Sequence, residues 1–399
     1  MKCKITNKKI IPIMSFGQMP LANGFLKKKD FNSEYFYNLS VGWSESLSLF
    51  QLNEFPNPKK MFNNNYPFFS GSSQYMINHF QKYSKWIKKN YASGSSNIIE
   101  IGSNDGTMLQ NFKKFGDNYI GFEPSKSVAD AALNKKIKTL NEFFNYKNVN
   151  KVKNFIHNTD IVYAANVICH IPDIKDLLKS IDKVLNSDGL FIFEEPYLGS
   201  MFKKVSYDQI YDEHIYIFSI SSVLNIFKLY DFELIDAIPQ VTHGGSMRYI
   251  VSRKKKYKST SRLKNLLELE KKDGLDDFGS CLDFKNNCEI SKRKTLNKLI
   301  HYKKNKKKIC GYGATSKSTT ILNYCKIGPE IIDCIFDTTI EKVNKFSPGM
   351  HIPIIKMDKS KFNMFDVSYL FAWNHKKEIF YKEKKFLKNG GEWFSHVKI

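Results

Sequence analysis

A histidine beside a carboxylate is the feature of this sequence best suited to acid–base chemistry. Tyr211, Glu213 and His214 fall within four residues and have aromatic residues around them. A neighbouring carboxylate can orient a histidine and keep it basic, as a general base requires near neutral pH. We predict that His214 is a base oriented by Glu213; the alternative is a structural histidine tied into a loop.

A glycine turn between a strand and a helix provides a candidate ligand site. Ile98–Ile101 is a short apolar run, Gly102 and Gly106 bracket a polar turn, and helical spacing follows from Thr107. This layout brings backbone N–H groups and a helix N-terminus to a nucleotide-like ligand. The same turn is also an ordinary connection between strand and helix.

Further polar residues follow the predicted strands, at the edge where ligands bind in parallel sheets. Glu123 lies about 20 positions beyond the glycine turn, a spacing typical of a carboxylate that binds ribose hydroxyls; the alternative is a surface charge. A tight hairpin turn is the alternative for the cluster His243–Arg248. The other candidates at this edge are Asn104, Asp105, Asn166, His170, Glu194, Glu195 and Tyr197.

The elements that must position these residues alternate between strand and helix over residues 80–255. This pattern predicts a doubly wound α/β domain whose last two strands pair antiparallel at the sheet edge. Residues 1–79 are irregular apart from a hairpin over 37–51, and 75–91 has helical spacing. Residues 256–305 predict long charged helices. Residues 308–399 predict a second, smaller Rossmann-like domain, whose own glycine turn either holds part of a nucleotide or is structural.

Composition excludes some classes of protein. No apolar run approaches the roughly 20 residues of a membrane span, and the N-terminus lacks a signal peptide, so we expect a cytoplasmic protein with no membrane partner. The seven scattered cysteines predict reduced thiols. The net charge of +23 suggests a polyanion partner, but only four of the 62 basic residues are arginine, which favours a solvated lysine surface over nucleic-acid binding.

The chain resembles the S-adenosylmethionine-dependent sugar C-methyltransferases, which act on nucleotide-linked ketosugars. Nine motifs in the order of that family carry the resemblance: Gln18-Met-Pro-Leu-Ala-Asn23, Tyr66-Pro-Phe-Phe-Ser70, Glu100-Ile-Gly-Ser-Asn-Asp-Gly106, Asn166-Val-Ile-Cys-His170, Glu195-Pro-Tyr197, Tyr211-Asp-Glu-His214, His243-Gly-Gly-Ser-Met-Arg248, Gly311-Tyr-Gly-Ala314 and Ala372-Trp-Asn374. The resemblance implies a small N-terminal domain (1–79), a class I methyltransferase domain (80–255) and linker helices with a C-terminal Rossmann-like domain (256–399).

The resemblance also implies roles for the candidate residues. His214 is the base that forms an enolate, and Tyr211, Tyr66 or His170 donates a hydrogen bond to the enolate oxygen. S-adenosylmethionine is the cofactor, and the residues expected to bind it are Glu100, Gly102, Asn104, Asp105, Gly106, Glu123 and Asn166. The residues expected to bind the nucleotide-linked sugar are Glu195, Tyr197, His243 and Arg248.

One departure from the family concerns zinc. The N-terminal domain of the family usually holds a zinc ion on two cysteine pairs, but here Thr6 stands where the partner of Cys3 belongs, and residues 41–46 contain no cysteine. One cysteine cannot make a four-ligand site. We therefore predict no metal there and a domain held by its own core, around Phe25, Phe36, Trp43, Phe50 and Phe55.

Three other functions compete with sugar C-methylation. A sugar O-methyltransferase would use the same cofactor and base on a hydroxyl acceptor. A nucleotide-sugar binding protein that has lost catalysis is suggested by the missing zinc ligands. A nucleic-acid methyltransferase is suggested by the charge alone. No sequence feature indicates the oligomeric state.

Overall fold

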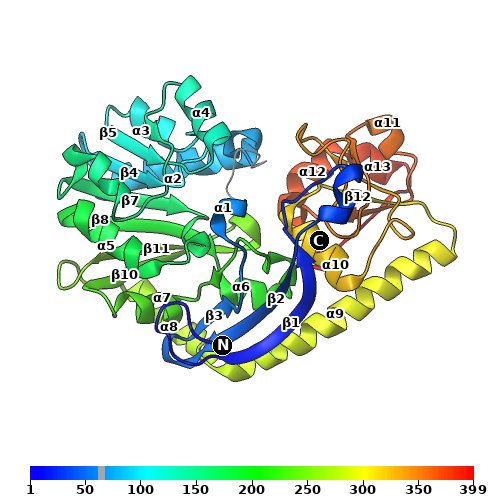
Figure 1. Ribbon diagram of the computed structural model, residues 1–399, viewed down its shortest axis with the longest axis horizontal. Coiled ribbons are helices and arrows are strands. Elements are labelled where there is room, and N and C mark those ends of the chain that lie inside the picture. The colour runs from blue at the N-terminus through cyan, green and yellow to red at the C-terminus, as the bar shows by residue number, and fades with distance from the viewer. Residues whose placement is uncertain (62–67) are drawn as a thin grey trace.

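Three β-sheets organise the computed structural model, which describes residues 1–61 and 68–399 (Figure 1). The seven-stranded central sheet has the order β10-β11-β8-β7-β4-β5-β6, and its strands β4 to β8 are parallel. The predicted antiparallel pair at its edge is confirmed as β10 and β11. The strands are β4 (Asn97–Ile101), β5 (Asn118–Phe122), β6 (Thr139–Leu140), β7 (Thr159–Ala165), β8 (Leu185–Pro196), β10 (Phe232–Gln240) and β11 (Ser246–Arg253).

Both faces of the central sheet are buried, which explains its continuous apolar strands. Ile98 packs in a cluster with α2 and α3, whereas Ile99 and Ile101 pack on the opposite face with α5 and α7. Successive strand residues point to opposite faces, so one run of apolar residues serves two layers. The helices of this domain are α2 (Gln74–Tyr91), α3 (Leu109–Lys114), α4 (Lys126–Asn134), α5 (Ile174–Val184), α6 (Leu198–Lys204) and α7 (Ile220–Phe227).

A four-stranded antiparallel sheet forms the N-terminal domain, in the order β1 (Ile11–Pro20), β2 (Phe36–Ser44), β3 (Leu49–Leu52), β9 (Tyr216–Ile217); α1 (Pro58–Met61) follows it. The hairpin over 37–51 is confirmed, but the expectation of irregular chain before it is wrong, because β1 pairs along most of β2. Of the predicted core, Trp43 and Phe50 are fully buried, whereas Phe36 is exposed.

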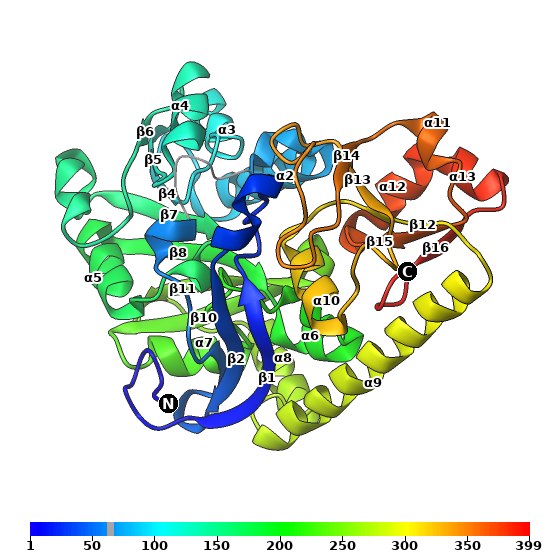
Figure 2. The same cartoon turned by 45° about the vertical axis from the view of Figure 1, so that its right-hand side comes forward.

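The C-terminal domain is a five-stranded parallel sheet, as predicted for a second Rossmann-like unit. Its order is β14 (Ile354–Lys356), β13 (Cys334–Asp337), β12 (Ile309–Tyr312), β15 (Val367–Leu370), β16 (Glu392–Phe394). The linker helices α8 (Ser261–Lys272) and α9 (Phe278–Lys304) lead to it, and α9 runs along the outside of the molecule (Figure 2). Its helices are α10 (Ser316–Cys325), α11 (Lys359–Phe362), α12 (Lys376–Lys382) and α13 (Lys384–Lys388).

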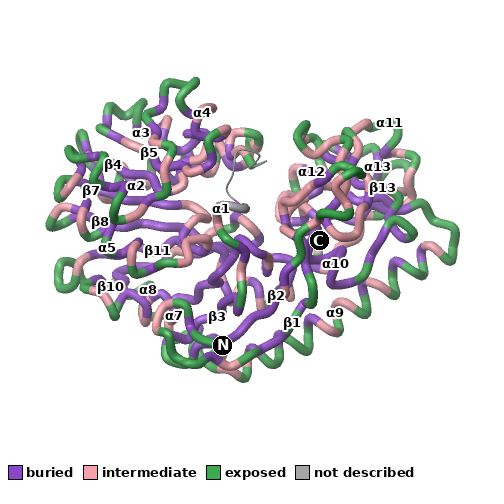
Figure 3. The backbone as a smooth tube through the Cα atoms, in the orientation of Figure 1, coloured by how far each residue is buried: buried purple, intermediate pink, exposed green. Residues whose placement is uncertain are grey.

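The three domains meet at helix α10. Residues 317–325 are all buried, and α10 contacts both β1 and the short turn Tyr207–Gln209 of the central domain. The burial view shows buried chain where α10 meets β1 (Figure 3). No helix in the described part of the chain is long and apolar enough to cross a membrane.

Candidate active site

The glycine turn after β4 has an unusual backbone geometry and lies close to the loop after β7. Gly102, Asn104 and Gly106 all have positive φ angles, of 66°, 50° and 73°. A Cβ atom on Gly102 would lie 2.5 Å from Cγ2 of Val167, so the turn can pass this close to the loop after β7 only with glycine. The two loops that end neighbouring strands are therefore held in contact.

Glu123 lies at the end of β5 and faces this turn, as expected. Its Oε2 accepts a hydrogen bond from the Asn104 N–H at 3.0 Å, and its Oε1 accepts one from the Ser125 N–H at 2.8 Å. Each carboxylate oxygen can accept a second hydrogen bond, so the group can still take ribose hydroxyls. Burial raises the pKa of Glu123, and the two backbone N–H groups partly offset this.

The remaining predicted cofactor residues fall into two groups. Asp105 lies in the turn and pairs with Lys135 at 2.9 Å, and Asn166 at the end of β7 bonds His243 Nε2 at 2.9 Å. Glu100 instead lies beneath the turn, where it accepts a hydrogen bond from the Tyr163 hydroxyl at 2.7 Å and where burial holds its pKa well above the usual range. A glycine turn with a carboxylate at the next strand end fits a nucleoside-type cofactor.

A second segment covers the turn from the N-terminal side. Asn104 Oδ1 accepts the Ser70 N–H at 2.8 Å, and Asp105 Oδ2 accepts the Gly71 N–H at 3.1 Å. A Cβ on Gly71 would lie 2.6 Å from that Asp105 oxygen. The motif that starts at Tyr66 thus reaches the cofactor turn, although Tyr66 itself lies outside the described residues.

His214 is buried and held at both ring nitrogens. Nδ1 lies 2.7 Å from the Gln209 carbonyl oxygen, and Nε2 lies 2.8 Å from the Tyr211 hydroxyl. A carbonyl can only accept, so Nδ1 carries the hydrogen and the lone pair of Nε2 accepts from Tyr211. Burial, followed by the nearby His170, holds the pKa of His214 well below its usual range, so the ring is neutral near pH 7 and Nε2 is available as a base.

Two possible hydrogen-bond donors accompany His214. The His170 ring stacks on that of His214 with 5.4 Å between centroids, and burial lowers the pKa of His170 to about 3. Burial, followed by the Glu213 charge, raises the pKa of the Tyr211 hydroxyl well above its usual range. Near neutral pH, a protonated phenol and a neutral imidazole therefore lie beside His214 as hydrogen-bond donors.

The expectation that Glu213 orients His214 is wrong, because both ring nitrogens are bonded to other groups. The Glu213 carboxylate instead accepts a hydrogen bond from Asn23 Nδ2 at 2.6 Å. Asn23 Oδ1 in turn accepts from the Ser316 hydroxyl at the start of α10. Glu213 thus joins the loop of the base to the other two domains.

The predicted substrate residues do not all face one space. Arg248 bonds Glu194 and stacks 3.7 Å from the Tyr83 ring centroid. Tyr197 hydrogen-bonds the buried Glu270 through its hydroxyl. These two side chains are therefore engaged in packing.

Glu195 and His243 border the candidate site. Glu195 accepts the N–H groups of Val167 and Ile168, which fixes the loop that carries His170. His243 is partly buried beside Asn166, and its φ angle is 51°.

Two important residues were not predicted from the sequence. Lys317, in the first turn of α10, is buried, lies 4.7 Å above the Trp373 ring, and its Nζ has no hydrogen-bond partner within the described part of the chain. Asp208 is fully buried and accepts the Trp373 indole N–H at 2.6 Å. Lysine and aspartate are so common at surfaces that their spacing carried no signal.

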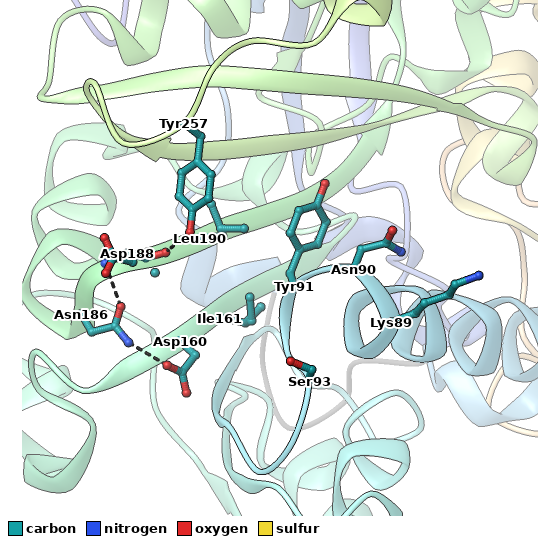
Figure 4. A pocket seen from close by; sticks show the side chains of 11 residues that line it. Lys89, Asn90, Tyr91, Ser93, Asp160, Ile161, Asn186, Asp188, Leu190 and Tyr257 are labelled. Atoms are coloured by element: carbon teal, nitrogen blue, oxygen red, sulfur yellow. Dashed lines mark hydrogen bonds between the residues drawn. The ribbon is translucent and has the colours of Figure 1, made fainter.

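A pocket of about 330 Å³ lies elsewhere, at the amino ends of the central strands (Figure 4). Tyr91, Asp160, Asn186 and Tyr257 are among its lining residues. Because the base and the glycine turn lie at the carboxyl ends, this pocket is separate from the candidate active site.

Clusters of side chains that could share a metal ion are scarce in the described ranges. The one group there of three or more histidine, cysteine or acidic side chains close enough to share an ion is Cys169, His170 and His214, whose ligand atoms lie within 4.8 Å of one another. Both nitrogens of His214 are already hydrogen-bonded. In the N-terminal domain, Cys3 is the sole cysteine, so the residues present do not fit a structural zinc ion.

Family models match the chain in three consecutive segments. They are described as a “Putative zinc binding domain” (residues 3–62), a “Methyltransferase domain” (75–237) and a “C-methyltransferase C-terminal domain” (241–397). The chain is 27% identical over 384 residues to C-methyltransferase NovU of Streptomyces niveus, covering 96% of this chain and 91% of that protein.

Solved structures match about half of the chain. The PH0226 protein of Pyrococcus horikoshii OT3 is 13% identical, covers 50% of this chain and 100% of its own, and has a TM-score of 0.39. Magnesium protoporphyrin IX methyltransferase of Synechocystis PCC 6803 is 11% identical, covers 44% of this chain and 83% of its own, and has a TM-score of 0.35.

The three family models follow one another in the order of the three sheets, and the methyltransferase model covers the glycine turn, Glu123 and His214. The chain is therefore an S-adenosylmethionine-dependent methyltransferase that resembles the C-methyltransferases along nearly its whole length, and its cofactor is S-adenosylmethionine.

Proposed function

We propose that the protein methylates a carbon next to the ketone of a nucleotide-linked ketosugar, in the biosynthesis of a branched sugar for a surface polysaccharide or a glycosylated metabolite. The observation that carries the proposal is the position of His214, whose Nε2 lies beside the Tyr211 hydroxyl and whose ring stacks on the neutral His170 ring. This arrangement suits removal of a weakly acidic C–H beside a carbonyl, followed by stabilisation of the enolate oxygen.

The residues divide the reaction between them. His214 Nε2 takes the proton from the carbon, and the Nδ1–H bond to Gln209 stabilises the charge that forms on the ring. The Tyr211 hydroxyl must leave Nε2 before this proton transfer, because both use the Nε2 lone pair. It turns to the ketone oxygen of the substrate and stabilises the enolate as it forms, and His170 can donate a second hydrogen bond. When bound at the glycine turn and Glu123, S-adenosylmethionine supplies the electrophilic methyl group. The rest of catalysis is positioning.

The buried positive charge of Lys317, at the start of α10, supports an anionic sugar carrier. Lys317 is a buried cation in the first turn of α10, where the helix dipole also favours negative charge. Burial lowers the pKa of Lys317, whereas Asp208 acts in the opposite direction. A buried lysine without a hydrogen-bond partner in the described chain is costly unless a ligand pairs with it. A nucleoside diphosphate group would meet that need.

The test is to replace His214 and measure turnover. His214→Ala should lower the rate of S-adenosylhomocysteine release with ketosugar nucleotides by at least about 100-fold, the contribution expected of a general base. His301→Gln, an exposed histidine on α9, should leave the rate unchanged. Binding of S-adenosylhomocysteine to both variants checks that they are folded. Near-wild-type turnover in folded His214→Ala would rule out the base.

O-methylation of a sugar is the second candidate, because the same base could deprotonate a hydroxyl group. The tyrosine and imidazole donors favour C-methylation, since an alkoxide nucleophile needs its charge left available whereas an enolate carries charge on an oxygen away from the reacting carbon.

A further inference from the structure

A buried carboxylate outside the reacting groups links the C-terminal domain to the base. Asp208 has no exposed surface, and both its oxygens face side chains of the C-terminal domain. Oδ2 accepts the Trp373 Nε1–H at 2.6 Å, and Oδ1 lies 3.2 Å from His396 Nε2. Burial opposes ionisation of Asp208, but the neighbouring His396 and Lys317 and the Trp373 hydrogen bond outweigh it and lower its pKa.

The partners of Asp208 are themselves fixed. His396 lies just beyond β16, and its Nδ1 is 3.1 Å from the hydroxyl of Tyr369 on β15, which also accepts the His396 backbone N–H. The Trp373 ring packs against Gly244, where a Cβ atom would lie 2.1 Å from the ring. Asp208 thus accepts a hydrogen bond from Trp373 and lies against His396, and both of these side chains are held by further contacts.

This fixed carboxylate adjoins the carbonyl that orients the base. The next residue, Gln209, accepts the His214 Nδ1–H at 2.7 Å through its carbonyl oxygen. On the other side of Gln209, the Ile210 carbonyl accepts the Thr320 hydroxyl of α10 at 2.9 Å. The C-terminal domain therefore holds the chain immediately before and immediately after the carbonyl.

We propose that Asp208 is a positioning residue for His214: held by Trp373 and His396, it fixes the Gln209 carbonyl so that His214 keeps its hydrogen on Nδ1 and its lone pair on Nε2. The C-terminal domain thereby sets the tautomer of the base. This inference rests on the proposed role of His214.

The experiment compares Asp208→Asn with a matched interface variant. Asn keeps the size of the side chain and can accept from Trp373, but it removes the negative charge facing His396. The control is His351→Gln, which breaks a similar histidine–carboxylate contact between domains, the 2.7 Å bond to Glu34, at a place unconnected to Gln209.

For Asp208→Asn we expect kcat to fall about 10- to 100-fold, the range seen when a residue that orients a catalytic ligand is lost. The hydrogen bond to Gln209 raises the pKa of His214, so loosening it should also move the acidic limb of the pH–rate profile to lower pH. S-adenosylhomocysteine affinity should stay near wild type. His351→Gln should change neither kcat nor the limb.

An unchanged kcat and an unchanged acidic limb in Asp208→Asn would overturn the inference, and so would an equal effect from His351→Gln. If Asp208→Asn does not fold, His396→Gln and Trp373→Phe each remove one partner and should show the same direction of change. The outcome is separable from the proposed function: an inactive His214→Ala beside a fully active Asp208→Asn contradicts the positioning role alone.

Discussion

We propose that His214 acts as a base because of three features: it is buried, its Nδ1–H is bonded to a carbonyl, and the Tyr211 hydroxyl and the neutral His170 ring lie beside it. Burial keeps the ring neutral, and the Gln209 carbonyl decides which nitrogen has the lone pair. A carboxylate in place of that carbonyl would raise the pKa of the ring further. With a carbonyl as its partner, His214 is therefore a base of modest strength, and its Nε2 carries no proton near neutral pH.

The buried Glu195 carboxyl group should make the stability of the protein depend on pH. Burial raises its pKa to about 7, so between about pH 4.5 and 7 the folded state holds a proton that the unfolded state has lost. The free energy of unfolding therefore falls as pH rises through this window. Glu195→Gln keeps an oxygen to accept from Val167 and Ile168 but removes the titration, so its stability relative to wild type should rise by about 3 kcal/mol from pH 4.5 to 7.

Urea unfolding of both proteins at several pH values across that window measures this difference. Glu378→Gln is the control, because that carboxylate lies on the partly exposed helix α12. A difference between Glu195→Gln and wild type that does not vary with pH would contradict the raised pKa.

The side chains proposed to take part in the reaction were predictable from the sequence, whereas the buried charged side chains around them were not. Tyr211 and His214 lie close in the sequence, and His170 follows a strand that ends at the same sheet edge, so local patterns indicate their convergence. Asp208 and Lys317 act only through contacts between residues more than 50 positions apart, such as Asp208 with Trp373 and Lys317 with Trp373. No local periodicity reports such contacts.

The turn between β10 and β11 joins an element of the central sheet to the C-terminal domain. His243, Gly244 and Gly245 all have positive φ angles, and the Trp373 ring fills the space beside Gly244. The two readings of this turn, a tight hairpin and a polar cluster, are compatible in the structure, since the hairpin geometry brings His243 to Asn166.

Gly244→Ala should therefore lower stability more than a matched glycine substitution. Gly94 also has a positive φ angle, of 81°, but a Cβ there meets nothing within 4 Å, so Gly94→Ala should cost about 1–2 kcal/mol from backbone conformation alone. Gly244→Ala must in addition displace Trp373, an overpacking cost of about 1–3 kcal/mol, and should lower kcat through Asp208. Thermal unfolding and turnover measure both effects; equal losses of stability in the two variants would show that Trp373 does not confine this turn.

Elements with regular periodicity were predicted well. Helix α2 and the longer parallel strands of both Rossmann-like domains follow from apolar spacing, whereas the short strands β6, β14 and β16 were not predicted. Strand β1 was not predicted, because Gly17 and two register shifts interrupt the alternation of its side chains. Its extended conformation depends on pairing with β2. Strand β9 is two residues long and exists only through pairing with β3.

The three domains meet on α10, and each contributes to the surroundings of one base. The N-terminal domain supplies Asn23, which bonds Glu213, the central domain supplies His214 and the cofactor turn, and the C-terminal domain supplies Lys317 and the partners of Asp208. The domain order was predictable from repeated strand and helix patterns. Their common contact was not, because it depends on packing between α10 and elements about 100 or more positions away.

The identity of the bond formed is the most direct test of C-methylation at this site. The protein would be incubated with a ketosugar nucleotide and S-adenosylmethionine carrying a ¹³C-labelled methyl group, and the product examined by carbon NMR. The account predicts a methyl carbon bonded to the sugar carbon next to the ketone, absent when His214→Ala replaces wild type. A labelled methoxy carbon in the product would contradict it.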